Sequence, residues 1–518
     1  MQATRTYLSR RKKDARTLRQ GRHALVMIDG REVAALLTLS CVGWFALSHR
    51  WTNAETIQWS VGLSLLTIMT LLLGVYFQGR REPGHIWTLL FWFRVSCAVY
   101  YGFGGIVPFI ANDVTDIYLR SVYNYTPLDV LKVNVICLFG ITCTMAGGYF
   151  KELVSRPSRK RTGPMRRPIS LSQGQVAAIF LVAGGAIRYG LQMPLAFGLL
   201  DITLPGGILF FGNAYLAGLF FALVIGLRKG GMSLLFAILL FVIDLTVFGL
   251  LSFAKLEILR TLMFGFLALI YTRFSVPRVI AAAIVMFAIF SASQPFVHYG
   301  RMEALLITGN TGSATLQQRL KITQAYLGGD GVHNAGWNRD LQPFLRLSYV
   351  NVGAFVINQY DRGSPGTSLR YALVSMVPRV IWPDKPRIGE LGSELYELIR
   401  GRDGAAVSAG YFAEVYWNFG PWGMVLIFLP VGVLFSFISN YSLNVIRSDS
   451  WHRFPAVLVG VQMGIRTDGH FAGDVTGAAA IFFILAIIFS LPSNSPQKSS
   501  GSVRLLPRRP DLLRRGAD

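Results

Sequence analysis

A proline-rich segment of the chain, Val377-Pro378-Arg379-Val380-Ile381-Trp382-Pro383-Asp384-Lys385-Pro386, contains residue types that suit phosphate binding. Its three prolines restrict the backbone, so we expect Arg379 and Lys385 to be held in place. An arginine guanidinium binds phosphate through two hydrogen bonds, and a lysine adds a point charge. We therefore interpret Arg379 and Lys385 as candidate ligands of a lipid-linked phosphate or pyrophosphate. The alternative is an interfacial turn whose tryptophan and cations only anchor in lipid headgroups.

Other charged residues could complete such a phosphate site. Four arginines are candidates, although each is also typical of an ordinary surface or headgroup-facing position: Arg301, Arg319, Arg346 and Arg370. A second group lies near the outer ends of expected membrane spans and could face the same site: Lys255, Glu257, Arg260, Arg466 and Asp468. No Asp-rich cluster suited to Mg²⁺ is present, so we expect neither a metal nor a cofactor.

A sugar hydroxyl that acts as a nucleophile needs a general base. Glu414 is the first candidate and His333 the second, although a lone loop histidine is usually only solvated. Tyr416 and Trp417 could stack on sugar rings, but they also fit an interfacial aromatic belt.

The composition indicates that membrane spans position these residues. The 518-residue chain is 52% hydrophobic and only 15% charged, whereas soluble proteins carry about 25% charged residues. We expect an all-α polytopic membrane protein with about twelve transmembrane helices. These lie near residues 33–49, 57–77, 86–108, 129–150, 174–191, 207–227, 232–252, 257–272, 279–293, 421–442, 454–466 and 475–491. Arg94 and Asp244 fall inside spans and could form a structural pair.

The excess of positive charge, with 50 Lys and Arg against 27 Asp and Glu, supports a definite orientation. Basic clusters occur in both tails, in loop 151–172 and at turns such as Arg80-Arg81, Arg228-Lys229 and Arg447 to Arg453. By the positive-inside rule, these segments and both termini are cytoplasmic. Anionic membrane lipids are sufficient partners for this charge, and we expect no nucleic acid binding.

The longest connection between spans, residues 294–420, is expected on the outer face as a large, partly helical periplasmic loop. It holds twelve basic and ten acidic residues, so it does not follow the positive-inside pattern. The expected organisation is a basic cytoplasmic tail at 1–32, nine helices at 33–293, the loop at 294–420, three helices at 421–492 and a disordered basic tail at 493–518.

Two segments of this loop resemble motifs of the oligosaccharide repeat-unit polymerases, the Wzy-type O-antigen polymerases. One is the Pro-Arg-x-Ile-Trp-Pro-x-Lys-Pro string at 378–386, and the other is Gly410-Tyr411-Phe412-Ala413-Glu414-Val415-Tyr416-Trp417-Asn418-Phe419-Gly420. The layout of a dozen spans with one large late external loop is also similar. The family often has a small-Ser-Arg step at the eighth span, where this chain has Ser252-Phe253-Ala254-Lys255, so Lys255 would replace the arginine.

The resemblance implies a glycosyltransferase that polymerises undecaprenyl pyrophosphate-linked oligosaccharide repeat units at the periplasmic face of a bacterial inner membrane. The products would be O-antigen, capsular or exopolysaccharide chains, and the reaction would be metal-independent. A chain-length regulator and a flippase would be its protein partners. Three alternatives stay open: an O-antigen ligase, a flippase or other transporter of lipid-linked oligosaccharides, and a structural partner in polysaccharide export.

Overall fold

The computed structural model describes residues 27–110, 123–155, 171–200, 212–272, 275–309, 314–329, 347–370, 372, 377, 382, 388–401 and 406–489. Every regular element in these ranges is a helix. The longer α-helices are α2 (Gly30–Ser48), α3 (Asn53–Arg81), α4 (Leu89–Cys97), α8 (Pro127–Val154), α9 (Gln173–Ile187), α12 (Asn213–Lys229), α13 (Gly231–Asp244), α14 (Lys255–Thr272), α15 (Val276–Thr308), α16 (Leu316–Leu327), α19 (Val350–Asp361), α21 (Ile388–Arg400), α22 (Tyr411–Arg447), α23 (Phe454–Ile465) and α24 (Ala478–Ile488).

Shorter helical segments extend or connect these. They are η1 (Pro83–Trp87), η2 (Ala98–Phe103), α5 (Gly104–Ile110), η4 (Arg188–Gln192), α10 (Met193–Ala196), η5 (Leu245–Leu250), η6 (Trp451–Arg453) and η7 (Ala472–Gly477). Four of them, η2, η4, η5 and η7, are π-helical.

Eight helices in the described ranges are long and apolar enough to cross a membrane, which confirms an α-helical polytopic membrane protein. They are Gly30–Ser48, Asn53–Arg81, Leu89–Ile110, Pro127–Val154, Gln173–Ala196, Gly231–Leu250, Pro277–Thr308 and Tyr411–Arg447. The other four expected spans coincide with α12, α14, α23 and the run from η7 to α24, which are shorter or more charged. A total of twelve crossings therefore stays a prediction.

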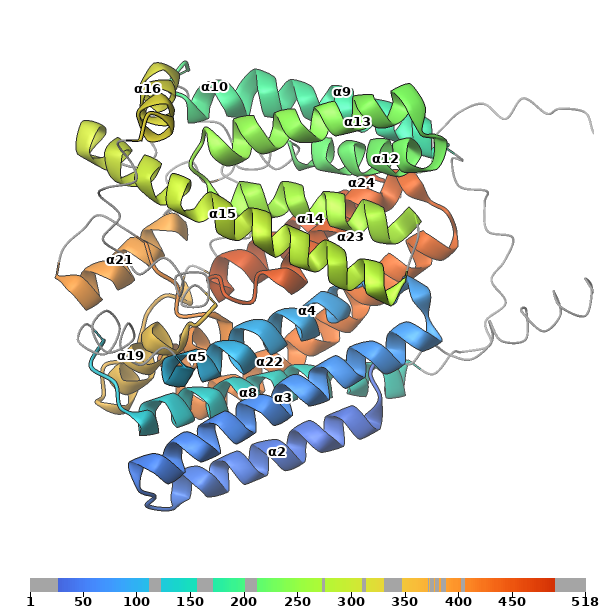
Figure 1. Ribbon diagram of the computed structural model, residues 1–518. Helices are drawn as coiled ribbons and strands as arrows, with labels where there is room; N and C mark the ends of the chain where they lie inside the picture. The colour runs from blue at the N-terminus through green and yellow to red at the C-terminus, as the bar shows by residue number, and fades with distance from the viewer. Residues whose placement is uncertain are drawn as a thin grey trace, which may run out of the picture.

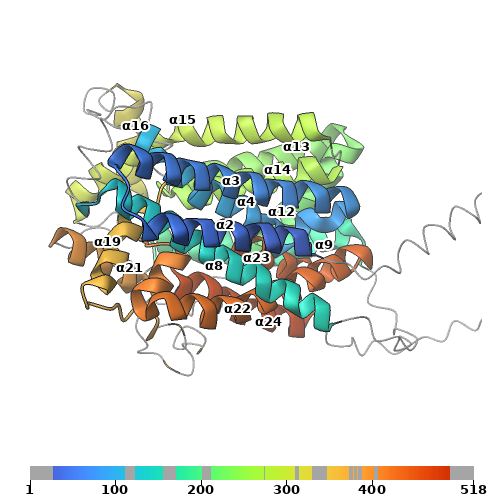
Figure 2. The same cartoon turned by 90° about the horizontal axis from the view of Figure 1, so that it is seen from below.

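The helices run side by side, so that the bundle has two distinct ends (Figures 1 and 2). At one end, which we call the basic end, Arg81 pairs with Asp29 and Arg447 pairs with Glu82. Arg228 donates to Gln173 at the same end. The opposite end carries α16, α19 and α21. The basic turns expected on one face thus meet at one end of the bundle.

Helices α8 and α22 cross in close contact within the bundle. Glycines on both helices let the two backbones approach closely, since a Cβ at Gly432 would lie 1.9 Å from the Thr144 carbonyl oxygen. A Cβ at Gly147 would similarly lie 2.0 Å from the carbonyl oxygen of Leu429. Any side chain at Gly432 would force the two helices apart.

The expected loop at 294–420 is bounded by helix at both of its ends. Helix α15 continues past Pro295 to Thr308, and α22 already begins at Tyr411. Gly420 has φ 62° and ψ −155°, which bends α22 at the position where the tenth span was expected to begin. Between these helices lie α16, α19 and α21, so the described part of the loop is largely helical.

Candidate functional site

Glu414, the first candidate for a general base, is buried in the first turn of α22 with 1% of its surface exposed. Its Oε2 accepts a hydrogen bond of 2.7 Å from the backbone N–H of Phe471 and lies 3.6 Å from His470 Nδ1. Its Oε1 has no hydrogen-bond partner among the described residues. A buried carboxylate oxygen without a donor is costly, so this atom is ready to accept a hydrogen bond from a ligand.

The turn between α23 and η7, residues 466–471, brings further charged groups beside Glu414. Arg466 NH1 lies 2.8 Å from Oδ1 of Asp474, and Tyr349 donates a hydrogen bond of 2.9 Å to Asp468. Burial raises the pKa of the Asp468 carboxyl, although the Tyr349 hydroxyl and Arg466 act in the opposite direction. The turn and η7 together therefore place an arginine, two carboxylates and an imidazole near the start of α22.

Backbone contacts fix this turn against the neighbouring helices. The Tyr101 hydroxyl donates to the carbonyl of Thr467 and accepts from the backbone N–H of Tyr411. Ser96 donates to the carbonyl of Ile465 at 2.7 Å, and its hydroxyl lies 2.6 Å from that of Thr467. The turn is thus held by α4 and η2 on one side and by α22 on the other.

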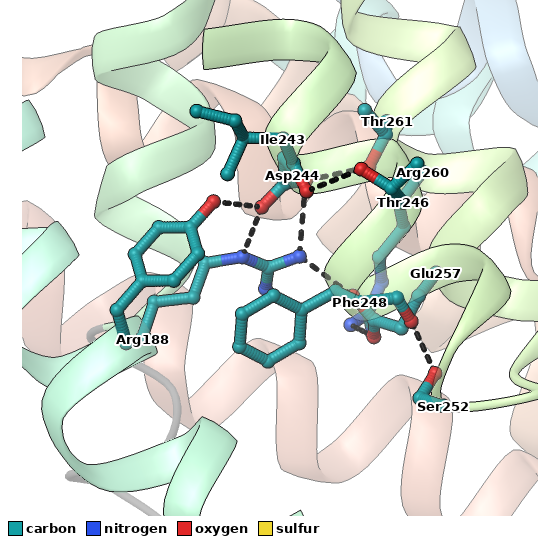
Figure 3. A network of polar contacts seen from close by, with 10 residues as sticks. Arg188, Ile243, Asp244, Thr246, Phe248, Ser252, Glu257, Arg260 and Thr261 are labelled. Atoms are coloured by element: carbon teal, nitrogen blue, oxygen red, sulfur yellow. Dashed lines mark hydrogen bonds and ion pairs between the residues drawn. The ribbon is translucent and has the colours of Figure 1, made fainter. Parts of the chain in front are cut away.

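A second polar network joins η4, α13 and α14 (Figure 3). Arg188 binds Asp244 through Nε–Oδ1 at 2.6 Å and NH2–Oδ2 at 3.2 Å, and it also lies 3.0 Å from Glu257. Arg260 binds the other oxygen of Glu257 at 2.5 Å, and Thr261 donates to Asp244. The Arg188 guanidinium also lies 4.0 Å above the centre of the Phe248 ring. Two arginines and two carboxylates make this network electrically neutral.

The two groups meet at Arg260 and Arg466. The charge of Arg466 repels that of Arg260, and Asp474 attracts both. Arg188 and Asp244 are at most 2% exposed, whereas the side chains of Arg260 and Arg466 are 21% and 39% exposed. Arg260 of the neutral network and Arg466 of the turn are therefore more exposed than Arg188, and guanidinium groups of this kind suit a phosphate or pyrophosphate.

Each of the four π-helical segments contributes a residue to this region: Tyr101 from η2, Arg188 from η4, Phe248 from η5 and Asp474 from η7. Such segments are energetically unfavourable and frequently occur at functional sites. Their convergence is an independent indication that this end of the bundle carries a function.

Among the other candidates, Arg301 and Arg319 bind the backbone between α13 and α14. Arg301 donates to the carbonyl of Phe253 at 2.8 Å. Arg319, which is 2% exposed, donates to the carbonyl of Ser252 at 3.0 Å. Lys255 begins α14 directly after this turn and is half-buried. In this structure the two arginines hold the turn that precedes Lys255 and Glu257.

The remaining described candidates make other contacts. Arg370 is exposed and lies 4.0 Å from Glu394. Tyr416 is 6% exposed and donates to Asp361, so its burial argues against stacking on a sugar. Trp417 donates to the carbonyl of Ser364, and its ring covers Gly366. These two rings hold segment 361–369 against α22.

Four candidates lie outside the described residues, and the structure therefore does not test their roles. They are His333, Arg346, Arg379 and Lys385.

The suggested Arg94–Asp244 pair is wrong. Arg94 instead binds Glu32 at 2.7 Å near the basic end, and both side chains are buried. Asp244 is bound to Arg188, close to the opposite end. A buried charge needs a partner, but the small number of charged residues inside the spans does not identify that partner.

Sequence reasoning missed Arg188 and His470. Arg188 was detectable, because it is a charged residue within an expected span, as Arg94 and Asp244 are. His470 gave no comparable signal, since it lies in a short turn and contacts a helix that begins far earlier in the chain.

Comparisons with protein-family models, with curated proteins and with solved structures found no match. Among the described residues, no group of three or more His, Cys, Asp and Glu side chains is arranged to hold a metal ion.

Proposed function

We propose that the chain is a polysaccharide polymerase that joins lipid-linked oligosaccharide repeat units at the outer face of a bacterial inner membrane. The growing glycan would leave its undecaprenyl pyrophosphate carrier and be transferred to a sugar hydroxyl of the next lipid-linked unit. In this proposal the bundle crosses the membrane twelve times and its basic end faces the cytoplasm.

The observation that carries the proposal is the buried Glu414 carboxylate, whose Oε1 has no hydrogen-bond partner among the described residues and which lies beside a turn that bears Arg466. A carboxylate that accepts no hydrogen bond at one oxygen is suited to take the proton of an attacking hydroxyl. The accessible guanidinium groups of Arg260 and Arg466 supply positive charge for a leaving pyrophosphate.

The proposed step is a balanced group transfer. The hydroxyl oxygen of the acceptor sugar forms a bond to the anomeric carbon of the donor glycan, and its proton passes to Glu414. The bond between that carbon and the pyrophosphate oxygen breaks, and the electron pair leaves with the lipid pyrophosphate. Because negative charge develops on this leaving group, fixed arginines stabilise the transition state more than the ground state.

No nucleotide is required, since the pyrophosphate linkage is already activated. We expect polymerisation to continue in EDTA, because arginines take the place of a divalent cation in this account. A large loss of activity in EDTA would contradict this part of the proposal.

Mass spectrometry of the lipid-linked oligosaccharide pool in cells that lack the gene tests the proposed function. A polymerase predicts single repeat units stranded on the carrier in the outer leaflet. Long chains that remain on the carrier would instead indicate a ligase. Units confined to the inner leaflet would indicate a flippase and would contradict the proposal.

A further inference from the structure

His470 contacts both the candidate base and a neighbouring segment that packs on the imidazole, residues 388–401 and 406–409, which we call the cover segment. On one side its Nδ1 lies 3.6 Å from Oε2 of Glu414. On the other side the ring is hydrogen-bonded to the backbone at Val407, whose own N–H donates to the carbonyl of Gly392 in α21. A Cβ at Gly392 would lie 3.2 Å from His470 Nε2, so α21 packs directly on the imidazole.

The groups around the imidazole favour its protonated form. Glu414 faces it from α22, Asp474 from η7 and the Val407 backbone from the cover segment. Arg466 lies in the same turn, but it is paired with Asp474. Burial alone would lower the pKa of His470, yet these neighbours outweigh burial and raise it above the ordinary imidazole value.

The two oxygens of Glu414 consequently differ in their hydrogen-bond partners. Oε2 is held by the backbone N–H of Phe471 and by the charge of His470. Oε1 is buried and has no partner in the described part of the chain. A protonated imidazole beside Oε2 therefore holds this oxygen in place and leaves Oε1 as the atom that can meet a ligand.

We propose that His470 is a positioning residue that holds Oε2 of Glu414, so that Oε1 is directed toward the acceptor hydroxyl, and that ties the cover segment to the site. The inference rests on the proposed function and adds to it the residue that makes the base competent. His470 does not itself touch the reacting atoms. Its effect reaches the reaction through Glu414 and through the closure of the cover segment.

The test is the pH dependence of polymerisation by full-length protein in liposomes, with lipid-linked repeat units as substrate. The contact with Glu414 is strongest while the His470 imidazole is protonated, so its loss in His470→Gln should lower activity most in acid and least in alkaline solution, where the wild-type imidazole has lost its charge. We expect a loss of at least about tenfold at the acid end and a smaller loss at the alkaline end. An unchanged profile shape, with activity lowered equally at all pH values, would overturn the proposal.

His452→Gln is the matched control. His452 is a buried histidine that hydrogen-bonds to a backbone carbonyl, that of Phe489, but it lies in η6, which follows the end of α22 at the basic end. Its variant should keep the wild-type profile. If wild type itself forms no polymer, the proposed function fails; if wild type is active and the two histidine variants behave alike, only the role of His470 fails.

A second measurement does not depend on activity. Leu395 lies on α21 and is 3% exposed, so a cysteine at this position should be shielded from a water-soluble maleimide while the cover segment is closed. In a background with Cys41→Ala, Leu395→Cys should react at least about tenfold faster when His470→Ala is also present. Equal labelling rates would show that His470 does not hold the cover segment.

Discussion

Arg188 and Asp244 form a two-bond ion pair in which both side chains are at most 2% exposed, with contacts of 2.6 and 3.2 Å. The pair comes from two helices of the bundle, and Glu257 connects it to Arg260. The neutral interior of this network is what allows Arg260 to be presented near the site without an unpaired buried charge.

Removal of one partner of this pair should destabilise the protein strongly. Asp244→Ala leaves Arg188 with only Glu257, and we expect a loss of about 3–5 kcal/mol in the free energy of unfolding. The double variant Arg188→Met with Asp244→Leu should recover part of that loss, because neither charge remains buried. Thermal unfolding in detergent measures both effects.

The exposed pair of Arg81 and Asp29 is the control for this prediction, since their side chains are 63% and 35% exposed. Arg81→Met should cost less than about 1 kcal/mol. Equal losses from the exposed and the buried pair would show that the Arg188 network contributes no special stability.

Arg466 should contribute to substrate binding through its charge. Arg466→Ala should raise the KM for lipid-linked substrate at least about tenfold, and Arg466→Lys should recover only part of the affinity, because lysine lacks the two-bond geometry. Steady-state kinetics in liposomes checks this. Arg362→Ala, which removes an exposed arginine at the end of α19, should leave KM unchanged. A similar KM for the Arg466→Ala variant and wild type would exclude Arg466 from the pyrophosphate site.

The close approach of α8 and α22 should make Gly432 intolerant of any side chain. Gly432→Ala places a methyl group 1.9 Å from a backbone oxygen of α8, so the helices must separate, at a cost of about 1–3 kcal/mol or more. Gly62 in α3 has nothing within 4 Å of its Cβ position, so Gly62→Ala should be neutral or slightly stabilising. Comparable yields and melting temperatures for the two variants would contradict this packing.

The stability contributed by His470 should depend on pH in a defined direction. Its pKa is raised in the folded protein, so its contribution is fully present below the ordinary imidazole pKa and is lost as the pH rises through the folded value. The difference in melting temperature between wild type and His470→Gln should therefore be largest in acid and shrink toward alkaline pH. A difference that grows with pH would contradict the assigned charge state.

The helical positions followed from the sequence, because long apolar runs in a membrane protein have few alternatives to helix. The sequence also contains evidence against Asp244 as the partner of Arg94. In an alternating topology Arg94 lies near the start of the third span and Asp244 near the end of the seventh, which places them at opposite ends of the bundle. The small number of charged residues inside the spans suggested the pair, whereas the directions of the two spans argue against it.

The composition of the site was only partly accessible from the sequence. Glu414 was found because it lies in a recognisable motif, and Arg260, Arg466 and Asp468 because they lie near span ends. The contact between His470 and Glu414 depends on a turn meeting a helix start that is 56 positions away in the chain. No local pattern encodes such a meeting, since it results from the packing of α22, α23 and η7.

The most direct test of the account uses purified protein in liposomes, supplied with lipid-linked repeat units taken from cells that lack the gene. Wild type should convert single units into a ladder of longer glycans and release the undecaprenyl pyrophosphate carrier. Glu414→Gln should reduce the rate by about 10²- to 10⁴-fold, while Glu397→Gln, an exposed carboxylate change in α21, should not. Full activity of the Glu414→Gln variant would contradict the role of Glu414 as the base, and no ladder with wild type would contradict the proposed polymerase function.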